Sequence, residues 1–185
     1  MKRRFLALAA LPLLLSSCAL FRSSALPITV QDARTPIAGR VLPPARVDIF
    51  GVCGPEEKTA AMATPVDEYF STLGLETRPT EVSVLYPSPG KPALIYRKDP
   101  HLTLWPKSGA DTLIAVASQP ILRNQTHRDA RMLCFPYRAS DYPSGTASLC
   151  LTLADDGLHI SPSPDKIPAA PAQPTTPQQG DAIVE

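Results

Sequence analysis

Between residues 28 and 160 the chain is a succession of short β-type runs that proline, glycine and aspartate interrupt. The whole sequence has 22 prolines in 185 residues, and proline cannot donate a hydrogen bond to a sheet ladder. Runs this short and this frequent favour an antiparallel β-sandwich over a parallel sheet built from βαβ units. The fold class is therefore predicted as all-β. The expected strands are 28–32, 45–52, 80–86, 92–97, 101–105, 111–118, 131–136, 147–153 and 157–160.

Alternation within the runs indicates how each strand is covered. Val47, Ile49 and Gly51 alternate with the residues between them, and 81–86 alternates in the same way, as in half-buried strands. Residues 113–117 are apolar at every position, which predicts a central strand covered on both faces. The stretch 153–158, Leu-Ala-Asp-Asp-Gly-Leu, predicts a tight hairpin, because Asp and Gly tolerate the positive φ of such turns.

One segment, 64–74, has a helical period instead. Val66, Tyr69, Phe70 and Leu73 fall at positions i, i+3, i+4 and i+7 and so share one face of a helix. The segment opens with a capping threonine and a proline at the first helical position, and it closes with a glycine. We expect a short helix against the sandwich, with its two aromatic side chains in the core rather than in a binding site.

The N-terminus has the order of parts found in an exported lipoprotein. A basic start, Lys-Arg-Arg at 2–4, precedes an apolar run at 5–15 that is too short to cross a bilayer. The following Leu-Ser-Ser-Cys resembles the bacterial lipobox, in which the thiol is acylated and becomes the first mature residue. We predict a signal peptide at 1–17, a lipidated Cys18, and a spacer at 18–27. Ala19 after the cysteine, by resemblance to lipoprotein sorting, implies the outer membrane. The alternative is an ordinary secretory signal that contains a cysteine.

Removal of the signal peptide changes the charge of the chain. It takes away three basic residues and lowers the formal net charge from +1 to −2. That balance predicts no basic patch for nucleic acid or anionic lipid. The domain proper is expected at 28–160. Six prolines punctuate 161–185, which is predicted as a disordered tail because it cannot bury enough apolar surface. This tail either reaches toward peptidoglycan or a partner, or is a plain untethered terminus.

Three cysteines remain in a compartment that permits disulfides: Cys53, Cys134 and Cys150. Cys134 and Cys150 lie in consecutive expected strands, so a bridge across one hairpin is the pairing that is simplest to build. The alternative is that all three are small buried hydrophobic residues. No CxxC or Cys/His spacing suggests zinc, so no metal site and no cofactor are predicted.

The sequence offers no catalytic constellation. His101, His127 and His159 are separated in sequence and form no HxxH or HExxH motif. Ser88 and Ser144 lie in proline turns without the Gly-x-Ser-x-Gly elbow, and no GxGxxG or phosphate loop is present. The protein is therefore predicted not to be an enzyme, with a cell-wall hydrolase as the enzymatic alternative.

Five stretches of the chain carry a family resemblance: the lipobox, RVDIFGV, TPVDEYFS, EVSVLYPSPGKPALI and WPKSGADTLIAVASQP. Together they resemble the outer-membrane lipoproteins of the type VI secretion system (TssJ/VasD). The resemblance runs from Cys18 to about residue 160. The compressed first half, the cysteine set and the proline-rich tail depart from the family.

The resemblance implies a transthyretin-like β-sandwich with one or two short helices. It implies a protein anchored in the outer membrane, facing the periplasm, that binds the periplasmic part of an inner-membrane protein of the TssM/IcmF type. The family's partner contact corresponds here to the loop 33–44, with Arg34, Ile37, Arg40 and Leu42 as exposed candidates; the alternative is a plain connector. A pilotin or chaperone-like lipoprotein that binds an outer-membrane client by strand addition is the other functional class.

Overall fold

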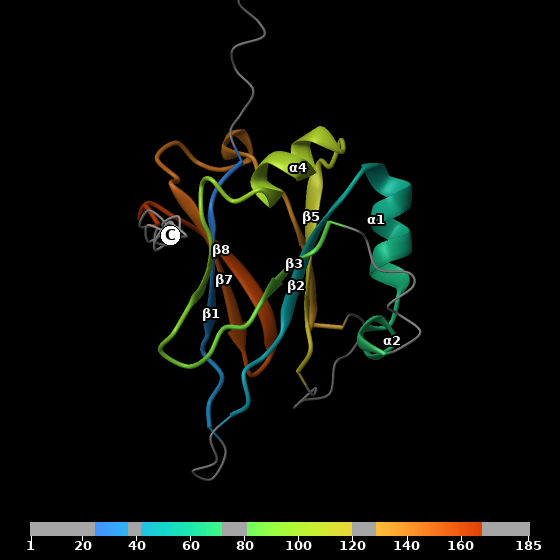
Figure 1. Cartoon of the computed structure of the whole chain (residues 1–185), viewed down its shortest axis with the longest axis vertical. Coiled ribbons are helices and arrows are strands. Elements are labelled where there is room, and N and C mark those ends of the chain that lie inside the picture. The colour runs from blue at the N-terminus through green and yellow to red at the C-terminus, as the bar shows by residue number, and fades with distance from the viewer. Residues whose placement is uncertain (1–24, 37–41, 72–80, 120–128, 168–185) are drawn as a thin grey trace, which may run out of the picture.

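The computed structural model describes residues 25–36, 42–71, 81–119 and 129–167. Two four-stranded sheets lie face to face in this part of the chain (Figure 1). The first sheet has the order β4-β1-β7-β8, with β4 at Ala93–Ile95, β1 at Ile28–Asp32, β7 at Ser148–Ala154 and β8 at Gly157–Ser163. The second has the order β3-β2-β5-β6, with β3 at Ser83–Leu85, β2 at Val47–Val52, β5 at Thr112–Ala117 and β6 at Met132–Phe135. The predicted β-sandwich is thus confirmed.

One strand pair differs from the expected antiparallel pattern. β1 and β7 run parallel, with Ile28 opposite Leu149 and Asp32 opposite Leu153. The other five strand pairs are antiparallel. Parallel partners need a long connection between them, and most of the domain separates β1 from β7. Local alternation in the sequence carries no information about such a distant pairing.

The main core lies between the sheets. Leu149, Leu151 and Leu153 of β7 point into it at every second position, and Val47 and Ile49 of β2 point toward them from the other sheet. All five side chains have an exposed fraction of 0%. The face assignment that alternation predicts for β2 is therefore confirmed, and this core is what holds the two sheets together.

Two helices cover the outer face of the second sheet (Figure 1). α1 spans Gly54–Ala63 and α2 spans Val66–Phe70. Val66 and Tyr69 of α2 pack with Phe50 and with Ile114 of β5 in a second apolar cluster. The prediction that 113–117 is covered on both faces is confirmed, because helices lie on one side of β5 and the first sheet lies on the other.

The helical prediction for 64–74 was right in place but too long. α2 ends at Phe70, and the expected last positions, Leu73 and Gly74, lie outside the described residues. α1 was not predicted at all. It contains no buried residue, so it has no apolar stripe for periodicity to detect. Its sequence signals are a proline at the first turn followed by Glu56 and Glu57, which suit the positive end of the helix dipole.

The predicted strand at 101–105 was wrong. The segment is a helix, α4, at His101–Lys107. Leu102 and Leu104 alternate as they would in a strand, but the residues that the fold buries are Leu102 and Trp105. These two are three positions apart and therefore share one helical face. Burial of the indole, with an exposed fraction of 0%, decided the conformation against the local alternation.

The C-terminal boundary also lies later than expected. β8 continues to Ser163, and the hydroxyl of Ser148 donates a hydrogen bond to the backbone oxygen of Asp165 at 2.7 Å. The first residues assigned to the tail are therefore part of the sandwich, while 168–185 lies outside the described residues. Among the described helices, none has the length and apolar content needed to cross a bilayer.

Candidate functional site

The two ends of the sandwich differ in what they carry. We call the end where β1 begins the proximal end; there the backbone N–H of Leu26 donates to the oxygen of Tyr137 at 2.9 Å, close to α4. We call the end where β1 stops the distal end. There the chain leaves β1, and there it enters β2 (Figure 1). β1 crosses the whole sandwich, so these two ends face opposite directions.

Arg34 at the distal end is not the exposed residue that the family resemblance implied. It has an exposed fraction of 8%. Its guanidinium donates to both carboxylate oxygens of Asp32, at 2.8 and 2.7 Å, and to the backbone oxygen of Pro43 at 2.8 Å. A bidentate pair of this kind fixes geometry as well as charge. Arg34 therefore joins the two ends of the loop 33–44 instead of offering a charge to a partner.

Three other residues of this loop were candidates for the partner contact. Leu42 is half-buried, whereas Ile37 and Arg40 lie outside the described residues. The loop is also tied to the β7–β8 hairpin, because the carboxylate of Asp155 accepts a hydrogen bond from the backbone N–H of Thr35 at 2.9 Å. The predicted hairpin at 153–158 is confirmed, and its first aspartate holds the base of the loop in place.

A cavity of about 410 Å³ opens near the distal end, between α2 and the start of β6. Arg131 lies in its wall, and its guanidinium binds the carboxylates of Asp129 at 2.7 Å and Asp67 at 2.6 Å. These hydrogen bonds hold the pKa of both carboxyl groups below their usual range and raise the pKa of the arginine. The cation is therefore neutralised. It clamps α2 to the second sheet.

A second clamp holds α2 from beneath. Asp48 points to the outer face of β2 and has an exposed fraction of 0%. Its carboxylate accepts two hydrogen bonds from Arg46, both at 2.7 Å, and one from the hydroxyl of Tyr69 at 3.2 Å. The guanidinium of Arg46 also lies over the ring of Phe70, 5.6 Å from its centre. The aromatic pair of the predicted helix therefore packs against the sheet, as expected.

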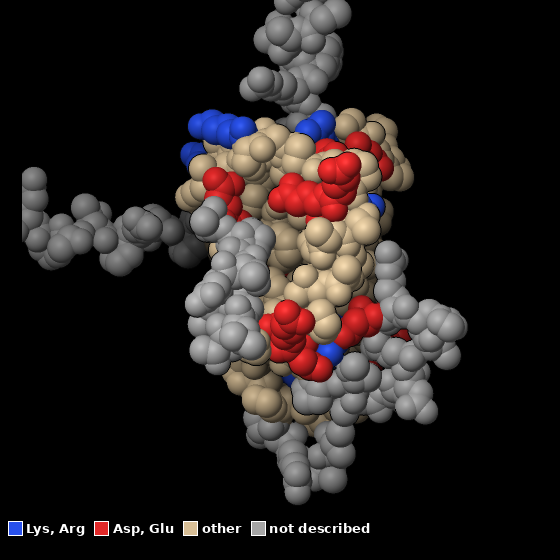
Figure 2. Space-filling view, turned by 90° about the vertical axis from the view of Figure 1, so that its right-hand side faces the viewer, with Lys and Arg blue, Asp and Glu red and all other residues tan. Residues whose placement is uncertain are grey.

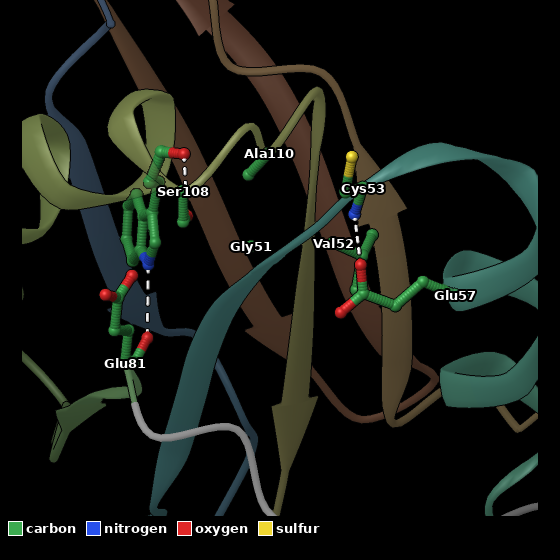
Figure 3. A pocket seen from close by; sticks show the side chains of 8 residues that line it. Gly51, Val52, Cys53, Glu57, Glu81, Ser108 and Ala110 are labelled. Atoms are coloured by element: carbon green, nitrogen blue, oxygen red, sulfur yellow. Dashed lines mark hydrogen bonds between the residues drawn. The ribbon is translucent and has the colours of Figure 1, made fainter.

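A second, smaller cavity of about 270 Å³ lies between the start of α1 and α4 (Figure 3). Glu57 and Glu81 stand on its two sides. One carboxylate oxygen of Glu57 accepts a hydrogen bond from the backbone N–H of Cys53 at 2.6 Å. The indole N–H of Trp105 donates to the backbone oxygen of Glu81 at 3.2 Å. Each of these contacts fixes one wall of the cavity.

The expected bridge between Cys134 and Cys150 is contradicted by the geometry. β6 and β7 belong to different sheets and form no hairpin. Cys134 packs with the helices on the outer face of the second sheet. Cys150 alternates with core leucines and so points outward from the first sheet. Sheets pack about 10 Å apart, beyond the reach of a disulfide. Both thiols are free, as is Cys53, which is exposed.

The histidines lie apart from one another. His101 is 2.8 Å from a carboxylate oxygen of Asp99, and His159 is 2.8 Å from Asp156; His127 lies outside the described residues. Within the described part of the chain, no group of three or more His, Cys, Asp or Glu side chains is arranged to hold a metal ion.

The comparisons with known proteins point to one fold. No protein-family model matches the sequence, and no curated protein matches it. In structure, the chain is similar to Serratia marcescens Lip, described as a membrane bound component of the type VI secretion system. The TM-score is 0.50 at 10% sequence identity, over 76% of this chain and 98% of Lip.

Two further solved structures are similar. One is the type VI secretion lipoprotein TssJ1 from Pseudomonas aeruginosa, with a TM-score of 0.46 and 14% identity over 76% of this chain and 98% of that chain. The other is described as the C-terminal domain of the type VI secretion protein TssM from EAEC, with a TM-score of 0.46 and 12% identity over 74% of this chain and 98% of that chain. The likeness to Lip shows the fold: the chain has the sandwich of a type VI secretion lipoprotein, as the sequence resemblance implied.

Proposed function

We propose that this protein is a non-enzymatic lipoprotein of the type VI secretion membrane complex. In this proposal Cys18 is acylated and inserted in the outer membrane. The domain faces the periplasm and binds the periplasmic region of an inner-membrane protein of the TssM/IcmF type. The observation that carries the proposal is the combination of a lipobox-like sequence with a domain whose fold is that of Lip, a membrane bound component of the same system.

The arrangement of the two ends supports this role. Ala25 lies seven positions after Cys18, which allows a tether of at most about 25 Å. β7 has seven residues, which at about 3.3 Å per residue span roughly 23 Å from the proximal to the distal end. The base of the loop, residues 33–36 and 42–44, thus lies at the end opposite the tether, where a partner that crosses the periplasm can reach it.

The proposed contact uses residues of this loop other than Arg34, because Arg34 is engaged within the domain. The hydrogen bonds of Arg34 to Pro43 and of Asp155 to Thr35 fix the base of the loop. A loop with a fixed base loses less conformational entropy when it binds. The candidates for direct contact are Ile37, Arg40 and Leu42.

Two measurements test the proposal. Cys18→Ser is expected to abolish both membrane fractionation and type VI secretion. In a binding assay, the mature protein should bind a periplasmic fragment of the TssM-type protein, and the double variant R40E/L42D should weaken that binding at least tenfold, about 1.4 kcal/mol. Lys58→Glu, on α1 away from the loop, is the control and should bind normally. Absence of binding at tens of micromolar would contradict the assigned partner.

A further inference from the structure

We propose that the proximal end of the domain is a docking surface for an anionic lipid bilayer. The inference rests on the proposed acylation of Cys18. It goes further, because it assigns a face of the folded domain to the membrane itself. The residues concerned are Arg97, Lys98, Leu104 and Lys107, on the turn before α4 and on α4.

The first argument is the position of the tether. Ala25 forms a β-bridge with Arg138, and the ring of Tyr137 lies 6.3 Å from that of Trp105 in α4. The point where the chain enters the domain is therefore next to α4. Since at most about 25 Å of chain separates Ala25 from the lipidated residue, the tether keeps this end within reach of the membrane.

The second argument is charge. Arg97, Lys98 and Lys107 are all exposed, and none of the three forms an ion pair with any described residue. Figure 2 shows Lys and Arg side chains along the upper rim of the molecule, which is the proximal end. The first turn of α1, with Glu56 and Glu57, lies beside this rim, across the second cavity from α4. The acidic residues of α2 lie toward the distal end.

Three aspartates at the same end accept hydrogen bonds within the protein. Asp99 accepts from the backbone N–H and lies 2.8 Å from the ring nitrogen of His101. Asp111 accepts from the N–H of Gly54 at 3.3 Å, and Asp141 accepts from that of Arg138 at 3.3 Å. Arg97, Lys98 and Lys107 have no such partners among the described residues and are left to meet an anionic surface.

The third argument is the exposed face of α4. Leu102 and Trp105 are buried, whereas Leu104 is 38% exposed and is one of the few large apolar side chains that the described surface shows. Leu104 and Lys107 are three positions apart, so they lie on the same side of the helix. An apolar side chain beside basic groups suits the interface between headgroups and acyl chains.

The test uses the full acylated protein, reconstituted in vesicles of phosphatidylethanolamine and phosphatidylglycerol whose headgroups carry a nitroxide quencher. Trp105 is the only tryptophan in the chain and lies next to Leu104, so its fluorescence reports contact of α4 with the bilayer. Each basic residue near an anionic surface contributes about fivefold to the ratio of docked to undocked protein. The variant K98Q/K107Q should therefore lower this ratio roughly 25-fold, and salt should lower it in the wild type by screening.

The matched control is K58Q/K91Q, which removes two exposed lysines on α1 and in the β3–β4 turn and should leave the quenching unchanged. Equal quenching in neutral phosphatidylcholine vesicles, equal quenching for both double variants, or no quenching of protein that floats with the vesicles would each overturn the docking surface and leave the lipid anchor intact. Failure of the protein to float would overturn the anchor and the docking surface together. Absence of binding to the TssM-type fragment would contradict the proposed function and would leave the bilayer-docking surface standing.

Discussion

Gly51 offers the sharpest test of how the sandwich is packed. It lies in β2, and a Cβ built on it would stand 2.6 Å from the Cβ of Ala110 and 3.2 Å from a ring carbon of Trp105. The first distance is shorter than two carbon atoms tolerate. Glycine is therefore required here by the close approach of the segment that follows α4, even though the backbone of β2 would accept any residue.

The variant Gly51→Ala is expected to lower the free energy of unfolding by about 1–2 kcal/mol. Overpacking of a well-filled core costs roughly 1–3 kcal/mol. Alanine's lower conformational freedom in the unfolded chain returns roughly 0.5–1 kcal/mol. Urea unfolding followed by the fluorescence of Trp105 measures the difference as a change in midpoint.

The reasoning is tested by a double-mutant cycle with Ala110→Gly. That single change removes one of the two clashing carbons and should cost about 1–2 kcal/mol through chain flexibility and a lost buried methyl group. In the double variant the 2.6 Å contact is absent, so adding Gly51→Ala should then cost less than about 0.5 kcal/mol. The coupling should therefore be about 1 kcal/mol. Additive effects, or a Gly51→Ala variant as stable as the wild type, would refute the proposed contact.

The remaining predictions concern other parts of the described domain. The pKa of Asp129 is lowered by its hydrogen bonds to Arg131, so its contribution to stability is present above pH 4 and is lost as the pH falls through the folded-state value; thermal unfolding of Asp129→Asn should show a shallower acid loss. Tyr69→Phe removes a hydrogen bond to the buried Asp48 and should cost about 1 kcal/mol in urea unfolding. In the native mature protein a maleimide should label the exposed Cys53 fastest, and intact mass should not change on reduction; a gain of two mass units on reduction would contradict the geometry of the sheets.

The strands could be predicted wherever one local rule was sufficient. Val47 and Ile49 alternate because one face of β2 meets the core, and 113–117 is apolar throughout because both faces of β5 are covered. Local alternation failed at α4, where Leu102 and Leu104 imitate a strand. There the need to bury Trp105 against the end of the core selected a helix.

The candidate site was less predictable than the fold. Arg34 was expected to be exposed because the family resemblance assigned it to the partner-binding loop, but a carboxylate two positions earlier binds it inside the domain. Alternation places the side chain of Asp48 on the face of β2 opposite to Val47 and Ile49. It lies beneath α2, and Arg46 and Tyr69 satisfy its oxygens. Neither contact follows from periodicity, because each depends on partners that the fold brings together.

By itself the sequence determined the all-β class, the division into short strands, the position of a helix near 66–70 and the resemblance to a lipoprotein family. These follow from side-chain period, from proline and glycine, and from the order of residues around Cys18, all of which act over a few positions. Only the tertiary structure decided the parallel pairing of β1 with β7, the separation of Cys134 from Cys150 and the gathering of basic residues beside the tether. These depend on contacts between segments far apart in the chain, whose free energy of packing no local pattern records.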